Sequence, residues 1–98
     1  MAEMKLDEQH LAQALEQLTG WTVAAGKLHR EYRFPSFLEA MAFMNVAAIA
    51  IDKMDHHPEW ANVYSRVTVD LVTHSEGGIT EKDVALARRL QALAARFA

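Results

Sequence analysis

The chain has 98 residues, of which 51% are hydrophobic and 23% charged, a composition typical of one small globular domain and not of a disordered segment. A formal net charge of −3 and scattered basic residues argue against direct binding of nucleic acid, which normally needs a clustered positive surface. The absence of cysteine excludes a disulfide framework, a thiolate metal site and a cysteine nucleophile.

We therefore expect residues 1–98 to form a single domain. Residues 1–7 lack the apolar stretch of a secretory signal, so a cytoplasmic location is the expectation.

The first predicted element is an amphipathic helix between Asp7, which can cap its start, and Thr19, which Gly20 follows as a stop signal. Its apolar positions recur at the spacing of one helix face: Leu11, Ala14, Leu15 and Leu18. Two strands are predicted next, over residues 21–25 and 28–34, joined by a two-residue turn at Gly26-Lys27.

A second helix is predicted from Phe37 to Met54, because Ser36 and Glu39 have capping-box spacing and fourteen of the eighteen residues are apolar. A helix that is apolar nearly all round is buried on more than one side. A subunit interface is the simplest second contact, and complete burial within one monomer is the alternative. Minimal length, many alanines and Asn45 argue against a membrane span.

Pro58 disfavours helical geometry at the residue before it, so this helix should end before or near His57. Two further strands are predicted over residues 62–64 and 67–73, joined at Ser65-Arg66, and Gly77-Gly78 should form a turn. Thr80, with Asp83 three residues later, should cap a last helix. The expected class is α+β, with a four-stranded antiparallel sheet, three helices on one face and the order α-β-β-α-β-β-α.

The candidate functional residues are the histidines of the run Asp55-His56-His57-Pro58-Glu59-Trp60, with His74 at the end of the last predicted strand. Histidine exchanges protons near neutral pH because its unperturbed pKa is about 6.5. Grouped beside an indole, these histidines suggest acid-base chemistry on a flat ring. A zinc site of three histidines is an alternative, but adjacent histidines lack the usual separated ligand spacing, and no metal is expected. Histidines without a function are the other alternative.

The stretch from Asp52 to Tyr64, followed by Thr73-His74, Gly77-Gly78-Ile79-Thr80 and Asp83, resembles the pterin-4a-carbinolamine dehydratase family. The match includes the acidic residue four before the first histidine, His-His-Pro, the tyrosine six after the proline, the histidine ten after that and the later aspartate. It extends to Trp21, to residues 34–44 and to the final helix, so it covers nearly the whole chain.

The resemblance implies that water is lost from a 4a-hydroxytetrahydropterin, the product of aromatic amino acid hydroxylases, to give the quinonoid dihydropterin. It implies no cofactor, a homodimer or homotetramer, and a functional link to such a hydroxylase. A non-catalytic dimerisation or protein-interaction module of the same fold is the alternative. The expected acid-base residues are His56, His57 and His74, with His56 and His74 favoured for protonating the hydroxyl; the expected substrate-binding residues are Asp55, Trp60, Thr73, Ser75 and Asp83.

Overall fold

The computed structural model describes residues 4–98, so the first three residues of the predicted domain lie outside the described part. Its elements follow the predicted order: α1 (Glu8–Glu16), β1 (Thr22–Ala24), β2 (Lys27–Arg33), α2 (Phe37–Met54), β3 (Glu59–Val63), β4 (Arg66–Leu71), the short 3₁₀ helix η1 (His74–Glu76) and α3 (Glu81–Ala94). The predicted fold class and element order are confirmed.

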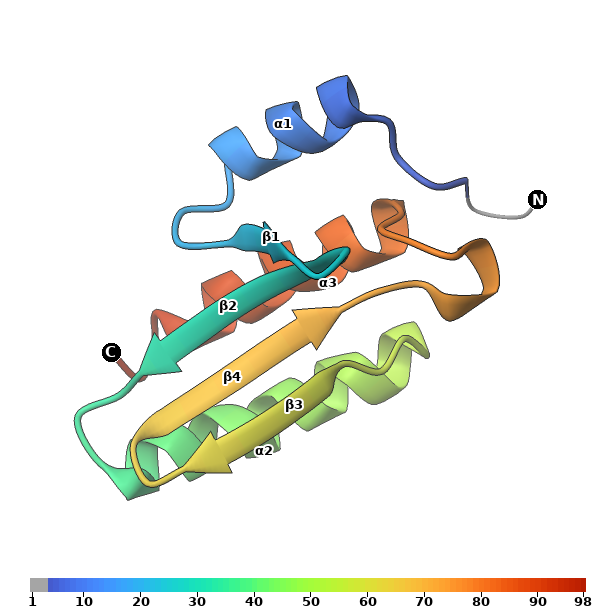
Figure 1. Ribbon diagram of the computed structural model, residues 1–98. Helices are drawn as coiled ribbons and strands as arrows, with labels where there is room; N and C mark the ends of the chain where they lie inside the picture. The colour runs from blue at the N-terminus through green and yellow to red at the C-terminus, as the bar shows by residue number, and fades with distance from the viewer. Residues whose placement is uncertain (1–3) are drawn as a thin grey trace.

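The four strands form one sheet in the order β1-β2-β4-β3, and every neighbouring pair is antiparallel. Helices α2 and α3 lie side by side behind the sheet in Figure 1, and α1 lies beyond the β1 edge. Helix α1 joins the same layer through α3, where Arg88 donates a hydrogen bond to Gln17 at 3.5 Å. The outer face of the sheet is not covered by any helix in the described chain (Figure 1).

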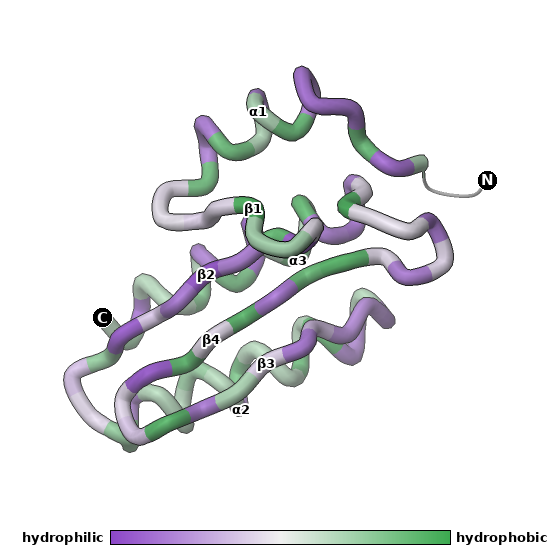
Figure 2. Tube along the Cα trace, in the orientation of Figure 1, coloured by the Kyte–Doolittle hydropathy of each residue, from purple (hydrophilic) through white to green (hydrophobic). Residues whose placement is uncertain are grey.

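Alternation along the strands explains this two-layer arrangement. One face of β2 and β4 contributes buried apolar side chains, while the opposite face carries polar and charged residues. In Figure 2 this alternation is seen as changing colours along β4. The helices complete the core with fully buried side chains of α2 and α3. The strand and helix residues at its centre are Leu28, Tyr32, Val67, Val69, Leu71, Ala40, Phe43, Ala47, Val84, Ala87 and Leu90.

Both predicted hairpin turns are wrong by one residue. The first turn is Ala25-Gly26, because Ala24 pairs with Lys27, and both turn residues have positive φ (52° and 77°). Such angles match the right-handed twist of the strands. In the second hairpin Val63 pairs with Arg66, which makes Tyr64-Ser65 the turn. Tyr64 has φ 53°, and no glycine marks this position in the sequence.

Three predicted boundaries also need correction. Helix α1 ends at Glu16, three residues before Thr19, because Gln17 already caps it. Strand β3 begins at Glu59, three residues before the predicted start, since its pairing with β4 extends to Asp70. Strand β4 ends at Leu71, because Thr73 pairs only with Gly78 and the chain then turns into η1.

Helix α2 spans the predicted residues and ends with Asp55 in a left-handed conformation (φ 50°), close to where Pro58 required it to end. Its buried side faces the core, but Leu38 and Ile49 remain 75% and 67% exposed. In Figure 2 the helix is green along most of its length. No helix of residues 4–98 is long and apolar enough to cross a membrane.

Candidate functional site

The predicted site residues gather at one end of the sheet. There the C-terminus of α2, the first residue of β3, η1 and the N-terminus of α3 come together (Figure 1). The antiparallel pairing explains this, because β3 starts at the end of the sheet where β4 finishes.

Asp83 lies at the centre of this region and is completely buried. Its Oδ2 accepts hydrogen bonds from the backbone N–H of Thr80 (2.8 Å) and from the hydroxyl of Thr73 (2.9 Å). The hydroxyls of Thr73 and Thr80 lie 2.7 Å apart, so Thr80 can donate to Thr73. The predicted capping box of α3 is confirmed, and it uses only one oxygen of the carboxylate.

The other oxygen of Asp83 binds His56. Nε2 of His56 lies 2.5 Å from Oδ1, and the His56 side chain is only 12% exposed. A buried carboxylate needs hydrogen-bonding partners, and a histidine N–H together with two further donors satisfies it. Capping and contact with histidine are therefore combined in one residue, which fixes His56 at the interface between α2 and α3.

His57 points elsewhere, as expected for neighbouring residues at a helix end. Its side chain is 64% exposed, and Nε2 lies 3.9 Å from Oδ1 of Asp55, which is itself 97% exposed. His57, Pro58 and Trp60 line one side of a cavity of about 390 Å³, and residues of α2 line the other: Ala48, Ile51 and Asp52. Trp60 pairs with Val69 of β4 and so projects from the helix-covered face of the sheet. The cavity therefore places an indole beside an accessible imidazole.

His74 begins η1, and its side chain is 77% exposed. Its Nε2 lies 3.2 Å from Oε2 of Glu59, and Oε1 of the same carboxylate accepts a hydrogen bond from Lys27 Nζ at 2.6 Å. The Lys27 ammonium is the main cause that holds the pKa of Glu59 below its ordinary value. Glu59 and Lys27 were not among the predicted site residues. A predicted β3 that began at Glu59 would have placed Glu59 opposite Asp70, on the same end of the sheet as Lys27.

The three histidines thus share one end of the sheet but have three different carboxylate partners. Thr73 lies in the network with its hydroxyl bonded to Asp83, while Ser75 is exposed on η1. Backbone N–H groups of Glu76 and Gly77 donate to the carbonyls of Thr73 and His74, which holds the 3₁₀ turn. Within residues 4–98, no group of three potential metal ligands gathers in one place.

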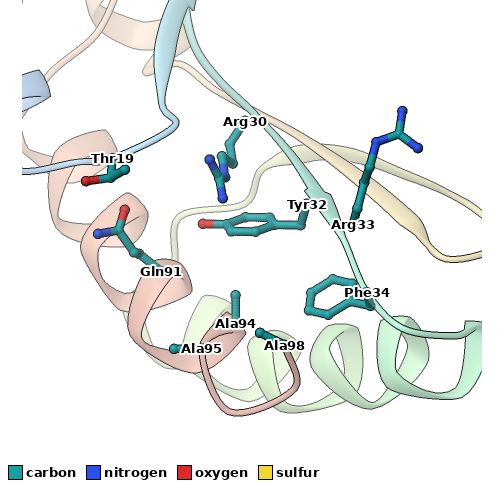
Figure 3. A pocket seen from close by; sticks show the side chains of 9 residues that line it. All are labelled: Thr19, Arg30, Tyr32, Arg33, Phe34, Gln91, Ala94, Ala95 and Ala98. Carbon is teal, nitrogen blue, oxygen red and sulfur yellow. The ribbon is translucent and has the colours of Figure 1, made fainter.

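A second cavity, of about 270 Å³, lies at the opposite end of the sheet and contains none of the predicted site residues. Arg30 stacks over the Tyr32 ring there, with Cζ 4.6 Å from the ring centroid. Gln91 and Ala94 of α3, with Ala95 and Ala98 after its end, complete the wall (Figure 3). Buried polar atoms of Arg30, Tyr32 and Gln91 face this region without a hydrogen-bond partner in the described chain.

Comparison with known proteins places the chain in a family. Residues 4–93 match the family described as pterin 4 alpha carbinolamine dehydratase. A protein of Solibacter usitatus is 55% identical over 91 residues, which is 93% of this chain and 96% of that one. One of Chelativorans sp. is 47% identical over 98 residues, covering 98% and 100% of the two chains. Both names assign the proteins, provisionally, as pterin-4-alpha-carbinolamine dehydratases.

Solved structures agree with these matches. A crystal structure from Brucella melitensis, described as a transcriptional coactivator/pterin dehydratase, has a TM-score of 0.88 and 44% identity, and covers 92% of this chain and 98% of its own. A pterin dehydratase-like protein identified as a RuBisCO assembly factor of the α-carboxysome shares the fold, with a TM-score of 0.63, 24% identity, and 76% and 86% of the chains covered. From the family match and the two close relatives it follows that this chain belongs to the pterin 4 alpha carbinolamine dehydratase family.

Proposed function

We propose that this protein removes water from a 4a-hydroxytetrahydropterin and releases the quinonoid dihydropterin. The reaction breaks the bond between C4a and the hydroxyl oxygen, which leaves as water after protonation, while the proton on N5 departs and a C4a–N5 double bond forms. One acid and one base on either side of the ring suffice, so the proposed reaction needs no metal or cofactor. The membership of the family supports the substrate class.

The observation that carries the catalytic proposal is the buried pair of His56 and Asp83. Because Asp83 receives the Nε2–H of His56, the opposite ring nitrogen, Nδ1, is the one that can exchange a proton with the substrate. The carboxylate also stabilises the imidazolium that forms when His56 acts as a base. Asp83 is completely buried, so we assign it a role through His56 and not a direct contact with the pterin.

We assign the pterin ring to the cavity beside His57 and Trp60, with Asp55 at its rim. The indole provides a flat apolar surface for the ring, and the exposed imidazole of His57 provides a hydrogen bond to its polar edge. We assign His74, which is exposed on η1, as the acid that protonates the hydroxyl, and the backbone of residues 73–75 as a source of further polar contacts.

The direct test is to add the purified protein to a hydroxylase reaction in which the 4a-hydroxytetrahydropterin accumulates, and to follow its decay. We expect the substrate to decay faster than at the spontaneous rate. In His56→Ala the acceleration should fall about 10²-fold or more, the range typical for the loss of one general acid or base. Decay at the spontaneous rate with a folded protein would reject the proposal.

A second candidate function is a non-catalytic protein-interaction module. The apolar side chains of Leu38 and Ile49, exposed on α2, support this alternative because exposed apolar surface is typical of protein interfaces. We propose that this surface joins copies of the chain in a homodimer or homotetramer. If interaction were the only function, a variant lacking all three histidines would keep its stoichiometric partner and the wild-type protein would show no dehydratase activity.

A further inference from the structure

Glu59 connects three segments on the outer face of the sheet. It is the first residue of β3, and its carboxylate binds Lys27 at the start of β2 through Oε1 (2.6 Å) and His74 at the start of η1 through Oε2 (3.2 Å). Each oxygen therefore has its own partner. Among residues 4–98, the ring of His74 forms its ion-pair contact with Glu59.

The ring of His74 has little packing to hold it. Its side chain is 77% exposed, and it begins a helix of three residues, which is too short to orient it by itself. A histidine that transfers protons must present one defined nitrogen to its substrate, and the hydrogen bond at the other nitrogen decides which one that is. The carboxylate of Glu59 is placed to make that bond.

The surroundings keep Glu59 charged and in place. The ammonium of Lys27 is the largest cause of the lowered pKa of Glu59, and Glu59 in turn raises the pKa of Lys27. The remaining titratable groups nearby on this face are His29 and Asp70, which pair with each other at 2.9 Å; Asp70 is the residue of β4 directly opposite Glu59. Lys27 thus holds the carboxylate through the oxygen that His74 does not contact.

We propose that Glu59 is a positioning residue for the dehydration, acting through His74. It accepts the Nε2–H of the ring, which directs Nδ1 toward the substrate, and it stabilises the imidazolium whose Nδ1–H protonates the leaving hydroxyl. Lys27 serves as the anchor of the carboxylate. This inference rests on the proposed function, because it assumes that His74 faces the pterin.

The chain offers a matched control on the same face. Glu31 is also a partly exposed carboxylate of the outer face, and it binds Arg33 at 2.8 Å without contacting a histidine. We expect Glu59→Gln to lower kcat about three- to tenfold with KM within about twofold, the small range reflecting an exposed, solvent-screened pair. Glu31→Gln should leave both constants unchanged, and Glu59→Asp should recover part of the lost kcat.

Two further measurements separate positioning from a general structural effect. In a His74→Ala background, Glu59→Gln should lower kcat no further, because the residue through which it acts is already missing. An equal fold loss in both backgrounds would overturn the proposal. The ¹⁵N resonances of the His74 ring should shift in Glu59→Gln but not in Glu31→Gln, and unchanged resonances would overturn it as well.

The ring resonances do not depend on catalysis. If the wild-type protein lacked activity, the proposed function would fall and with it the catalytic meaning of this contact, while a shift specific to Glu59→Gln would still establish that Glu59 orients His74.

Discussion

Replacing Asp83 with asparagine tests the link between the fold and the proposed chemistry. The asparagine oxygen can take the place of Oδ2 and keep the hydrogen bonds from Thr73 (2.9 Å) and Thr80 (2.8 Å). Its NH₂ group then faces Nε2 of His56, where the carboxylate oxygen stood at 2.5 Å. Nε2 must become an acceptor, and the proton of the neutral ring moves to Nδ1.

The magnitude follows from the bonds that change. One charge-assisted hydrogen bond is worth about 1.5–3 kcal/mol, so Asp83→Asn should lower the free energy of unfolding by about 2 kcal/mol. For a domain of this size that corresponds to a drop of about 8–16 °C in Tm. Asp83→Ala removes all three bonds and should cost about 3–5 kcal/mol. The misplaced proton should reduce the dehydration rate about 10²-fold or more.

Thermal unfolding followed by circular dichroism measures the first effect, and the decay of the carbinolamine at a temperature where the variant is folded measures the second. Asp70→Asn is the matched control, because Asp70 also binds a histidine, His29 at 2.9 Å, but on the outer face with both side chains about one third exposed. It should cost less than about 1 kcal/mol and leave the rate unchanged. A folded Asp83→Asn variant with the wild-type rate would refute the assignment of His56 and Asp83 as a functional pair.

Three further predictions follow from other parts of the molecule. Lys27→Met should raise the pKa of Glu59, which a ¹³C titration measures. Because the fold lowers this pKa, Glu59 stabilises the protein above its unfolded pKa of about 4.3, and this stabilisation is lost as the pH falls through the folded-state pKa. Melting curves from about pH 6 to about pH 3 should therefore show a smaller loss of stability in the variant than in the wild type. Gly20→Ala should lower the free energy of unfolding by about 1 kcal/mol or more, because Gly20 has φ +86° and a Cβ would stand 1.2 Å from Nη1 of Arg30. In an Arg30→Ala background only the backbone strain remains, so the cost of Gly20→Ala should be smaller. Equal costs in the wild-type and Arg30→Ala backgrounds, measured by urea titration, would contradict this reasoning. Ile49→Lys should give a smaller particle mass than the wild type in light scattering, and the resulting monomer should still unfold cooperatively. Ala12→Lys, on the exposed side of α1, should leave the mass unchanged. A wild-type protein that is monomeric at micromolar concentration would reject the proposed oligomer.

The helices and the order of the elements could be predicted from the sequence because their signals are local. Thr80 caps α3 with the capping box that its spacing predicted, and Asp7 caps α1 by accepting the N–H of His10. Ser36 caps α2 by accepting the N–H of Leu38, but its hydroxyl donates to the Glu39 side chain, so the reciprocal capping box predicted there is not formed. The turns could not be placed to the residue, since Ala25 and Tyr64 adopt left-handed backbone only because strand pairing requires it.

The candidate site was predicted in part for the same reason. The run from Asp55 to Trp60 and His74 identified the end of the molecule where the histidines gather. The partner of each histidine depends on segments far apart in the chain: Asp83 comes 27 residues after His56, and Lys27 lies 32 residues before Glu59. Only the sheet register brings Glu59 opposite Asp70 and within reach of His74.

The complete burial of Asp83 has a consequence for how members of such a family can change over evolutionary time. Hydrogen bonds join His56, Thr73, Thr80 and Asp83, so we expect a substitution at any of them to be selected against because it destabilises the fold, whether or not the protein is an enzyme. The side chains of His57 and His74 are 64% and 77% exposed, so we expect their replacement to change the stability of the fold little. We therefore expect relatives that lack the proposed activity to have lost the exposed histidines first and to retain the buried pair of His56 and Asp83.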